Sequence, residues 1–174
     1  MVYGPAMSVQ LRAAIPADAS EIARVHVRAW QVGYQGLLPD TYLGDLRAED
    51  RASRYTLGVA DASTPSTIVA VEGAAICGFV TTGPAREGTE GAGHLMALYV
   101  DPDRWGRGIG RVLIARGRAE LVARGYREAV LWVLAGNQRA ARFYDADGWV
   151  FDGQVGEREV WGIRVTDHRY RRSL

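Results

Sequence analysis

"YVDPDRWGRGIGRVLIARG", residues 99–117, joins a run that reads as a strand to a run that reads as a helix. Glycines stand at alternate positions of the turn between them: Gly106, Gly108 and Gly110. Arginines flank the same turn: Arg104, Arg107 and Arg111. A helix N-terminus carries unpaired amides and a partial positive charge, and glycines in front of it let further amides converge without a Cβ in the way. The stretch therefore predicts an anion-binding site, and a pyrophosphate is the ligand that suits it best.

Neither of the two common nucleotide loops fits this turn. A Walker loop needs Gly-Lys-Ser/Thr, whereas Gly110 is followed by Arg111 and Val112. A Rossmann fingerprint needs a third glycine three residues after the second, where this chain has Arg111 or Leu113. The glycines alone leave two interpretations open, a pyrophosphate site or a tight strand-to-helix turn with solvated arginines.

The rest of the chain mixes strand-like and helix-like runs without strict alternation. Expected strands cover residues 9–15, a hairpin over 66–83 that turns near Glu72-Gly73, and residues 94–100, 128–136, 149–153 and 159–174. Expected helices cover residues 17–34, one or two short helices over 37–59 that end at Gly58, and residues 110–125 and 137–148. This order predicts an α/β (α+β) fold in one domain, residues 1–174, with helices on both faces of a mixed sheet.

Cap residues support the helix limits. Asp18, with Glu21 three residues later, is a candidate N-cap of the first helix. Asn137 is a candidate N-cap of the last helix, and Gly148 is its expected stop.

Composition limits the partners and the cellular location that we expect. The formal net charge of +1 gives no reason to expect nucleic acid or an anionic membrane surface as a partner. No apolar run approaches the roughly 18–20 residues of a membrane span, and the first residues lack the features of a secretory signal. The single cysteine, Cys77, lies in the apolar run 74–80 and reads as a buried small hydrophobe rather than a nucleophile. We therefore expect a cytoplasmic protein.

Two stretches resemble one family in order and spacing. Residues 97–114 resemble the acetyl-CoA loop of the GCN5-related N-acetyltransferases (GNAT), written Q/R-x-x-G-x-G/A, with Trp105 in place of the usual Gln or Arg. Residues 131–150 resemble the following strand, helix and turn, written V-x-x-x-N-x-x-A-x-x-x-Y-x-x-x-G-F. In this second pattern the matching positions are Asn137, Ala140 or Ala141, Tyr144, Gly148 and Trp149. Residues 15–40 are also similar to superfamily members that act on small molecules.

The resemblance implies a GNAT fold, a mostly antiparallel sheet of about seven strands that splays between strands 4 and 5. It implies acetyl-CoA as the acyl donor, with the pantetheine arm in the splay and the pyrophosphate on the amides of residues 105–110. Because Trp105 replaces the usual Gln or Arg, Arg104 or Arg107 would supply the side-chain contact that this first position usually makes. The residues expected at the donor are Leu98, Tyr99, Val100, Arg104, Trp105, Gly106, Arg107, Gly108, Ile109, Gly110, Arg111, Asn137, Ala140, Phe143 and Tyr144.

The resemblance also implies catalytic and acceptor groups. Tyr144 is the expected general acid for the leaving thiolate, or else a packed aromatic residue. His94 is the expected general base or water-orienting group, with Glu90 as the alternative. The acceptor wall is expected to include His26, Trp30, Tyr34 and Trp161, which would favour a flat or apolar amine. The same residues would also suit an amphipathic helix that buries Trp30 in the core.

Two functions follow from the resemblance. The first is an acetyl-CoA-dependent N-acetyltransferase without a metal, which acetylates a primary amine of a small molecule or an N-terminus by direct attack in a ternary complex. The alternative is a non-catalytic acyl-CoA-binding sensor or interaction module. A small-molecule amine is the expected partner, with no nucleic acid and no membrane, and the homodimers common in the superfamily leave a homodimer open.

Overall fold

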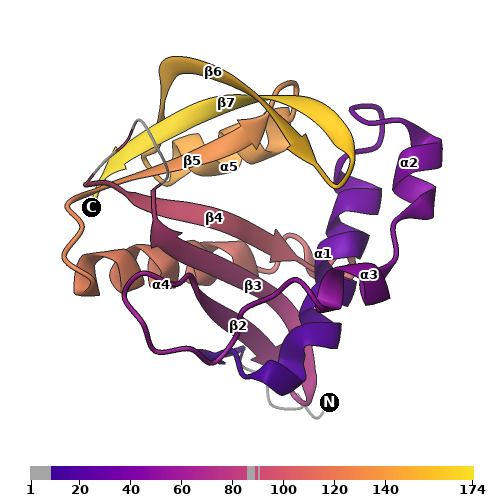
Figure 1. The fold of residues 1–174 in the computed structure, drawn as a ribbon, viewed down its shortest axis with the longest axis horizontal. Coiled ribbons are helices and arrows are strands. Elements are labelled where there is room, and N and C mark those ends of the chain that lie inside the picture. The colour runs from indigo at the N-terminus through magenta and orange to yellow at the C-terminus, as the bar shows by residue number, and fades with distance from the viewer. Residues whose placement is uncertain (1–8, 86–88, 90) are drawn as a thin grey trace, which may run out of the picture.

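The computed structural model describes residues 9–85, 89 and 91–174 and contains one seven-stranded sheet with helices packed on it (Figure 1). The strands are β1 (Gln10–Ala13), β2 (Ser66–Glu72), β3 (Ala75–Pro84), β4 (Gly93–Val100), β5 (Glu128–Leu134), β6 (Val150–Val160) and β7 (Ile163–Ser173). The α-helices are α1 (Ala19–Gly33), α2 (Asp40–Asp45), α3 (Ala48–Ala52), α4 (Ile109–Ala123) and α5 (Gln138–Ala146). Two 3₁₀ turns, η1 (Pro16–Asp18) and η2 (Pro102–Arg104), precede α1 and α4.

The sheet has the order β1-β2-β3-β4-β5-β7-β6 and is antiparallel except between β4 and β5. The parallel pair meets only at Gly93↔Ala129 and His94↔Val130. Beyond these residues the two strands separate, so the rest of this edge of β4 has no neighbouring strand. The predicted class, strand number and splay are confirmed.

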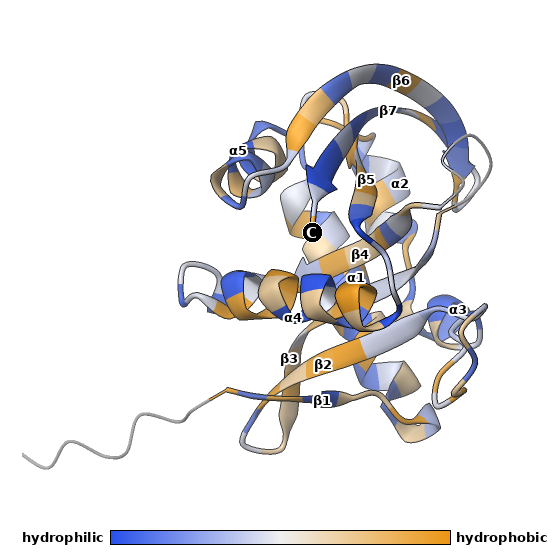
Figure 2. Ribbon diagram, turned by 90° about the vertical axis from the view of Figure 1, so that its left-hand side faces the viewer, coloured by the Kyte–Doolittle hydropathy of each residue, from blue (hydrophilic) through white to orange (hydrophobic). Residues whose placement is uncertain are grey.

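Helices cover both faces of the sheet, as the sequence predicts. The largest core cluster joins residues of α4 and α5 to one face, among them Leu113, Ile114 and Tyr144. Two smaller clusters join α1 to the other face through Ile22, Val25 and Trp30. Figure 2 shows this division, with α4 and α5 on one side and α2 and α3 on the other.

Several local predictions are confirmed. Asn137 caps α5 with its side chain, and Gly148 follows this helix in the left-handed region with φ +84°. The β2–β3 hairpin turns after Glu72, as predicted. Cys77 is fully buried, its thiol donates to the Ala70 carbonyl at 3.2 Å, and burial raises its pKa.

Other local predictions are wrong in instructive ways. Asp18 stands at the N-cap of α1, but its carboxylate accepts from the Ile15 amide and from Arg12 instead of capping the helix. The two short helices after Pro39 end at Ala52, well before Gly58. Strand β6 runs to Val160 rather than stopping at residue 153, because the chain passes an irregularity between Phe151 and Val155 and continues to pair with β7.

The turn between β6 and β7 carries the one non-glycine residue with positive φ among the described residues, Trp161 at φ +50°. Gly162 follows at φ +79°. Two successive positive φ values make the turn type that matches the twist of a hairpin, and its first position ordinarily takes Asn, Asp or Gly. The strained backbone directs the Trp161 ring onto Trp30, with 4.2 Å between ring centroids.

None of the helices in the described part of the chain is long and apolar enough to cross a membrane.

Candidate active site

The glycine turn has the backbone conformation of an anion site. Gly106 and Gly108 have φ of +78° and +82°, a region in which a Cβ is strained, and Gly108 is the N-cap of α4. Gly110 is needed for a different reason, because a Cβ there would lie 3.2 Å from the Phe143 ring. Among the described residues, no backbone carbonyl accepts from the amides of Gly106 to Gly110. These N–H groups are therefore left for a ligand.

Trp105 uses both of its N–H groups within the protein. Its backbone amide donates to the Pro102 carbonyl at 3.2 Å, and its indole Nε1 donates to the Val100 carbonyl at 2.8 Å. The Arg139 guanidinium lies over the indole ring, 3.3 Å from its centroid. The set of free amides therefore begins at Gly106 and not at Trp105, which corrects the prediction by one residue.

The open edge of β4 presents backbone groups in a defined order. The Asp101 amide donates to the Cys77 carbonyl on β3 at 2.8 Å. Backbone groups of successive strand residues point to opposite sides, so Tyr99 also faces β3. Leu98 and Val100 then face the open edge, where the Val100 carbonyl already accepts from the Trp105 indole. Of the three residues predicted to pair with a pantetheine arm, these two have the required orientation.

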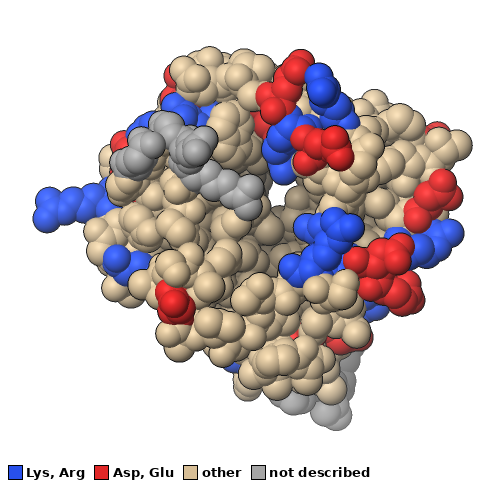
Figure 3. Space-filling view, in the orientation of Figure 1, with Lys and Arg blue, Asp and Glu red and all other residues tan. Residues whose placement is uncertain are grey.

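A cavity of about 400 Å³ connects the turn with this edge, a size in the range of small-ligand sites. Its lining takes in nearly all of the predicted donor residues: Leu98, Tyr99, Val100, Arg104, Trp105, Gly106, Gly108, Ile109, Gly110, Arg111, Asn137, Ala140, Phe143 and Tyr144. Arg107 is the predicted donor residue that lies outside this lining, and it is exposed. Figure 3 shows an opening in the middle of the face that carries α1, α2 and α3.

Tyr144 reaches the cavity from α5. Asn137 accepts from the Ala140 amide at 3.1 Å and so sets the start of this helix, two turns before Tyr144. Tyr144 is buried, with 8% of its surface exposed, and its hydroxyl has no hydrogen-bond partner among the described residues. Burial raises the pKa of Tyr144, and the neighbouring Tyr99 and Asp147 raise it further. The phenol is therefore protonated at neutral pH and free to donate to a ligand.

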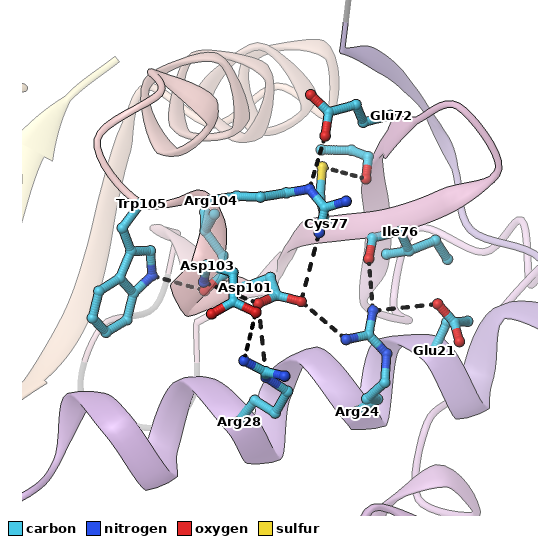
Figure 4. Close-up of polar contacts among 12 residues, drawn as sticks. Glu21, Arg24, Arg28, Glu72, Ile76, Cys77, Asp101, Asp103, Arg104 and Trp105 are labelled. Atoms are coloured by element: carbon cyan, nitrogen blue, oxygen red, sulfur yellow. Dashed lines mark hydrogen bonds and ion pairs between the residues drawn. The ribbon is translucent and has the colours of Figure 1, made fainter. Parts of the chain in front are cut away.

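Ion pairs around Asp101 fasten α1 to the start of the glycine turn (Figure 4). Asp101 is 2% exposed and accepts from Arg24 at 2.9 Å. Arg28 and Arg104 approach the same carboxylate at 3.7 and 3.8 Å. Burial would raise the pKa of Asp101, but hydrogen bonds from Arg24 and the Asp103 amide outweigh it and lower this pKa below its ordinary value. The carboxylate is therefore ionised at neutral pH and holds the turn in register with α1.

Arg104 is already engaged on the far side of the turn. Its Nε donates to Glu72 at 2.8 Å, and Figure 4 shows the side chain extended between Glu72 and Asp101. Arg107 and Arg111 are exposed and make no ion pair with a described residue. Of the three arginines around the turn, Arg107 and Arg111 therefore keep their charge unpaired among the described residues, whereas Arg104 does not.

The predicted acceptor residues divide into two groups. Tyr34 lines the cavity, and its hydroxyl lies 3.3 Å from that of Tyr99. His26 and Trp30 are 5% and 4% exposed and pack behind the lining, where Trp30 stacks on Trp161 and His26 stacks on Tyr99 at 4.4 Å. Burial lowers the pKa of His26 well below its ordinary value, and its Nδ1 lies 2.7 Å from a tyrosine hydroxyl. His26 is therefore a neutral packing residue.

Only one of the two candidate bases belongs to the described residues, and it is not part of the cavity lining. His94 is half-buried at the end of β4 where the strands still pair, and it lies outside the lining. Glu90 lies outside the described residues.

Some lining residues lie outside the predicted set. Trp132 and Leu134 stand two residues apart on β5 and so share a face of the strand, a signal that the sequence does carry. Arg158 reaches the lining from the C-terminal part of β6. It stands between two glutamates, Glu157 and Glu159, and this run carries no sign of which residue turns inward.

Comparison with known proteins agrees with this geometry. Residues 28–149 match the Acetyltransferase (GNAT) family. The chain is 32% identical over 140 residues to the N-acetyltransferase YuaI of Bacillus subtilis, an alignment that covers 79% of this chain and 78% of YuaI. It is 31% identical over 149 residues to the mycothiol acetyltransferase of Amycolatopsis mediterranei, covering 81% of this chain but only 46% of that protein.

Solved structures share the fold at lower identity. The PaiA N-acetyltransferase of Thermoplasma acidophilum, in complex with coenzyme A, superposes with a TM-score of 0.76 at 17% identity, over 97% of this chain and 100% of that one. YncA of Salmonella typhimurium, with acetyl-CoA, gives 0.69 at 18% identity, over 95% and 94%. Taken with the family match and the relative in Bacillus subtilis, these likenesses mean that the chain belongs to the GNAT family and is an acetyltransferase.

Proposed function

We propose that this acetyltransferase takes acetyl-CoA as its donor and acetylates the primary amine of a small molecule by direct attack in a ternary complex. The observation that carries the proposal is the single cavity that joins the free amides of residues 106–110 to the unpartnered hydroxyl of Tyr144. The complexes of PaiA with coenzyme A and of YncA with acetyl-CoA support the choice of donor.

The turn and the open edge would hold the donor. The diphosphate would accept hydrogen bonds from the amides that follow Trp105, beside the charges of Arg107 and Arg111. The pantetheine amides would pair with Leu98 and Val100 as an added strand. A backbone N–H of this edge would also polarise the thioester carbonyl.

The transfer itself needs two proton movements. The amine nitrogen bonds to the thioester carbon, and the tetrahedral intermediate collapses as the C–S bond breaks. Tyr144 gives its proton to the departing thiolate and regains one from solvent. The amine loses its proton to a base, for which we keep His94, acting through water because it stands outside the lining, with Glu90 as the alternative.

The test follows free thiol after acetyl-CoA and a panel of primary amines are mixed with the protein. We expect thiol release that depends on both the amine and the protein. Binding of coenzyme A without release on any amine would instead favour the acyl-CoA sensor or interaction module. Absence of coenzyme A binding would remove the donor assignment altogether.

A further inference from the structure

Resting on the proposed function, we infer that the amine acceptor carries a carboxylate, which Arg158 binds at the acceptor end of the cavity while Asp167 holds the guanidinium in place. The acceptor class is thus an amino acid or a similar amino-carboxylate. The inference comes from a charged lining residue on β6, an element separate from the glycine turn.

Arg158 is a cation with most of its donors unused. It lines the cavity from β6, and its side chain is 52% exposed. Its Nε donates to Asp167, and no other described residue accepts from it. The two Nη groups therefore keep the planar fork that fits a carboxylate in a bidentate pair.

Asp167 fixes the direction of that fork. It is 1% exposed, and it lies on β7 opposite Leu134 of β5 and Gly156 of β6. Its Oδ2 accepts from Arg158, and its buried Oδ1 has no partner among the described residues. A carboxylate this deeply buried is costly unless it is paired, so Arg158 is held toward it. Because Arg158 also lines the cavity, its two Nη groups are the donors left for a ligand there.

The position of Arg158 matches the acceptor end. Arg158 and Tyr34 line the same cavity, and Asp167, the partner of Arg158, lies opposite Leu134 of β5. Tyr34, Trp132 and Leu134 are lining residues as well. Burial raises the pKa of Tyr34, and the charge of Arg158 opposes this rise. An acceptor would therefore meet aromatic and apolar walls with one cationic fork.

The balance of charge favours an anion. The described lining contains no Asp or Glu, so no carboxylate there would pair with an additional cationic group on the acceptor. The Arg158–Asp167 pair is neutral by itself, but the unused donors of Arg158 still favour an anion.

Figure 3 shows both signs of charge around the central opening. Basic side chains border the central opening above and at lower right, with acidic side chains next to them. Every basic side chain drawn there is an arginine, because the sequence contains no lysine.

The test on the unaltered protein uses matched acceptors. L-Phenylalanine, L-leucine and L-methionine are each compared with their carboxamide and their decarboxylated amine, by thiol release from acetyl-CoA. We expect kcat/KM to be about tenfold or more higher for the acids, as one hydrogen-bonded charge implies. The carboxamides are the stringent comparison, since their less basic amines would react faster if the carboxylate were not recognised.

Variants locate the recognition. Arg158→Gln should lower kcat/KM for the acids by about tenfold or more and leave the amides and the KM for acetyl-CoA unchanged. Arg158→Lys, which keeps a charge for Asp167, should fold and retain part of the preference. Arg164→Gln is the matched control, because Arg164 is on the same hairpin, is 81% exposed and pairs only with Glu157.

The outcomes are separable. Equal rates for acids and carboxamides in the unaltered protein, or a preference that survives Arg158→Gln, would overturn this inference and leave the proposed function standing. No thiol release on any acceptor would overturn both.

Discussion

The proposed donor end and the proposed acceptor end of the cavity are built by different means. At the donor end the binding groups are main-chain amides of one continuous turn, positioned by Gly106 and Gly108. At the acceptor end the groups are side chains from separate elements, Tyr34, Trp132 and Arg158. A main-chain site follows from local sequence, because φ values and helix starts are local properties. A side-chain site depends on how distant strands pair, which is a property of the whole fold.

The largest expected effect tests the main-chain origin of the donor end. Gly108→Glu strains a residue at φ +82° and sets a carboxylate where the diphosphate belongs. At ~4 Å in a medium of effective dielectric ~20, two such charges repel by about 4 kcal/mol, or roughly a thousandfold in affinity. Calorimetric titration with acetyl-CoA measures the loss.

The control isolates charge from strain. Gly125→Glu changes a glycine at φ +90° with nothing within 4 Å of a new Cβ, which is also true of Gly108. Both variants should lose about 1–2 kcal/mol of folding stability from the left-handed backbone, but Gly125→Glu should bind acetyl-CoA with unchanged affinity. Wild-type affinity in Gly108→Glu would contradict the donor site.

This contrast explains what the sequence could and could not predict. The turn, the Asn137 cap and the face of Tyr144 are local and were predictable. The first free amide was misplaced by one residue because the η2 turn, which begins at Pro102, engages the Trp105 amide.

The roles of Arg158 and Asp167 could not be predicted from the sequence, for a different reason. The irregular pairing between Phe151 and Val155 sets which residues of β6 face inward, and a shift of one residue would turn Arg158 to solvent. Nothing in the local sequence specifies that register.

The second prediction tests whether Tyr144, between the two ends of the cavity, acts as the general acid. Tyr144→Phe removes the unpartnered hydroxyl and should lower kcat about a hundredfold, the lower range for a general acid. The KM for acetyl-CoA should change less, because the donor is held elsewhere. Tyr170→Phe is the matched control, since Tyr170 is equally buried at 8% in the same core cluster, and its kcat should not change. An unaltered kcat in Tyr144→Phe would remove this residue from the mechanism.

The third prediction concerns the link between the two ends. Asp101→Asn leaves Arg24 and Arg28 of α1 without their carboxylate, and because these arginines are partly exposed the expected loss of stability is about 2 kcal/mol. Urea unfolding at pH 7 measures the loss.

The pH dependence of this loss has a definite sign. Because the folded-state pKa of Asp101 is lowered, its contribution is complete above the ordinary carboxyl value of 3.8 and disappears as pH falls through the folded value below it. The difference between the two proteins should therefore be constant from pH 7 to about pH 5 and shrink only at lower pH. A difference that shrinks near pH 6 would point to another group.

The smallest expected effect sharpens the comparison most, because it changes a charged side chain at the donor end. Arg104→Gln removes a cation that lines the cavity, yet the guanidinium is held by Glu72 at 2.8 Å and approaches Asp101. If main-chain groups dominate this end, the affinity for acetyl-CoA should change less than about threefold, while stability falls by about 1 kcal/mol for a partly exposed pair. Glu72→Gln breaks the same pair from the other side and should lose the same stability. A tenfold loss of affinity in Arg104→Gln alone would mean that the arginine turns from Glu72 to the diphosphate when the donor binds, and that the donor end also depends on side chains.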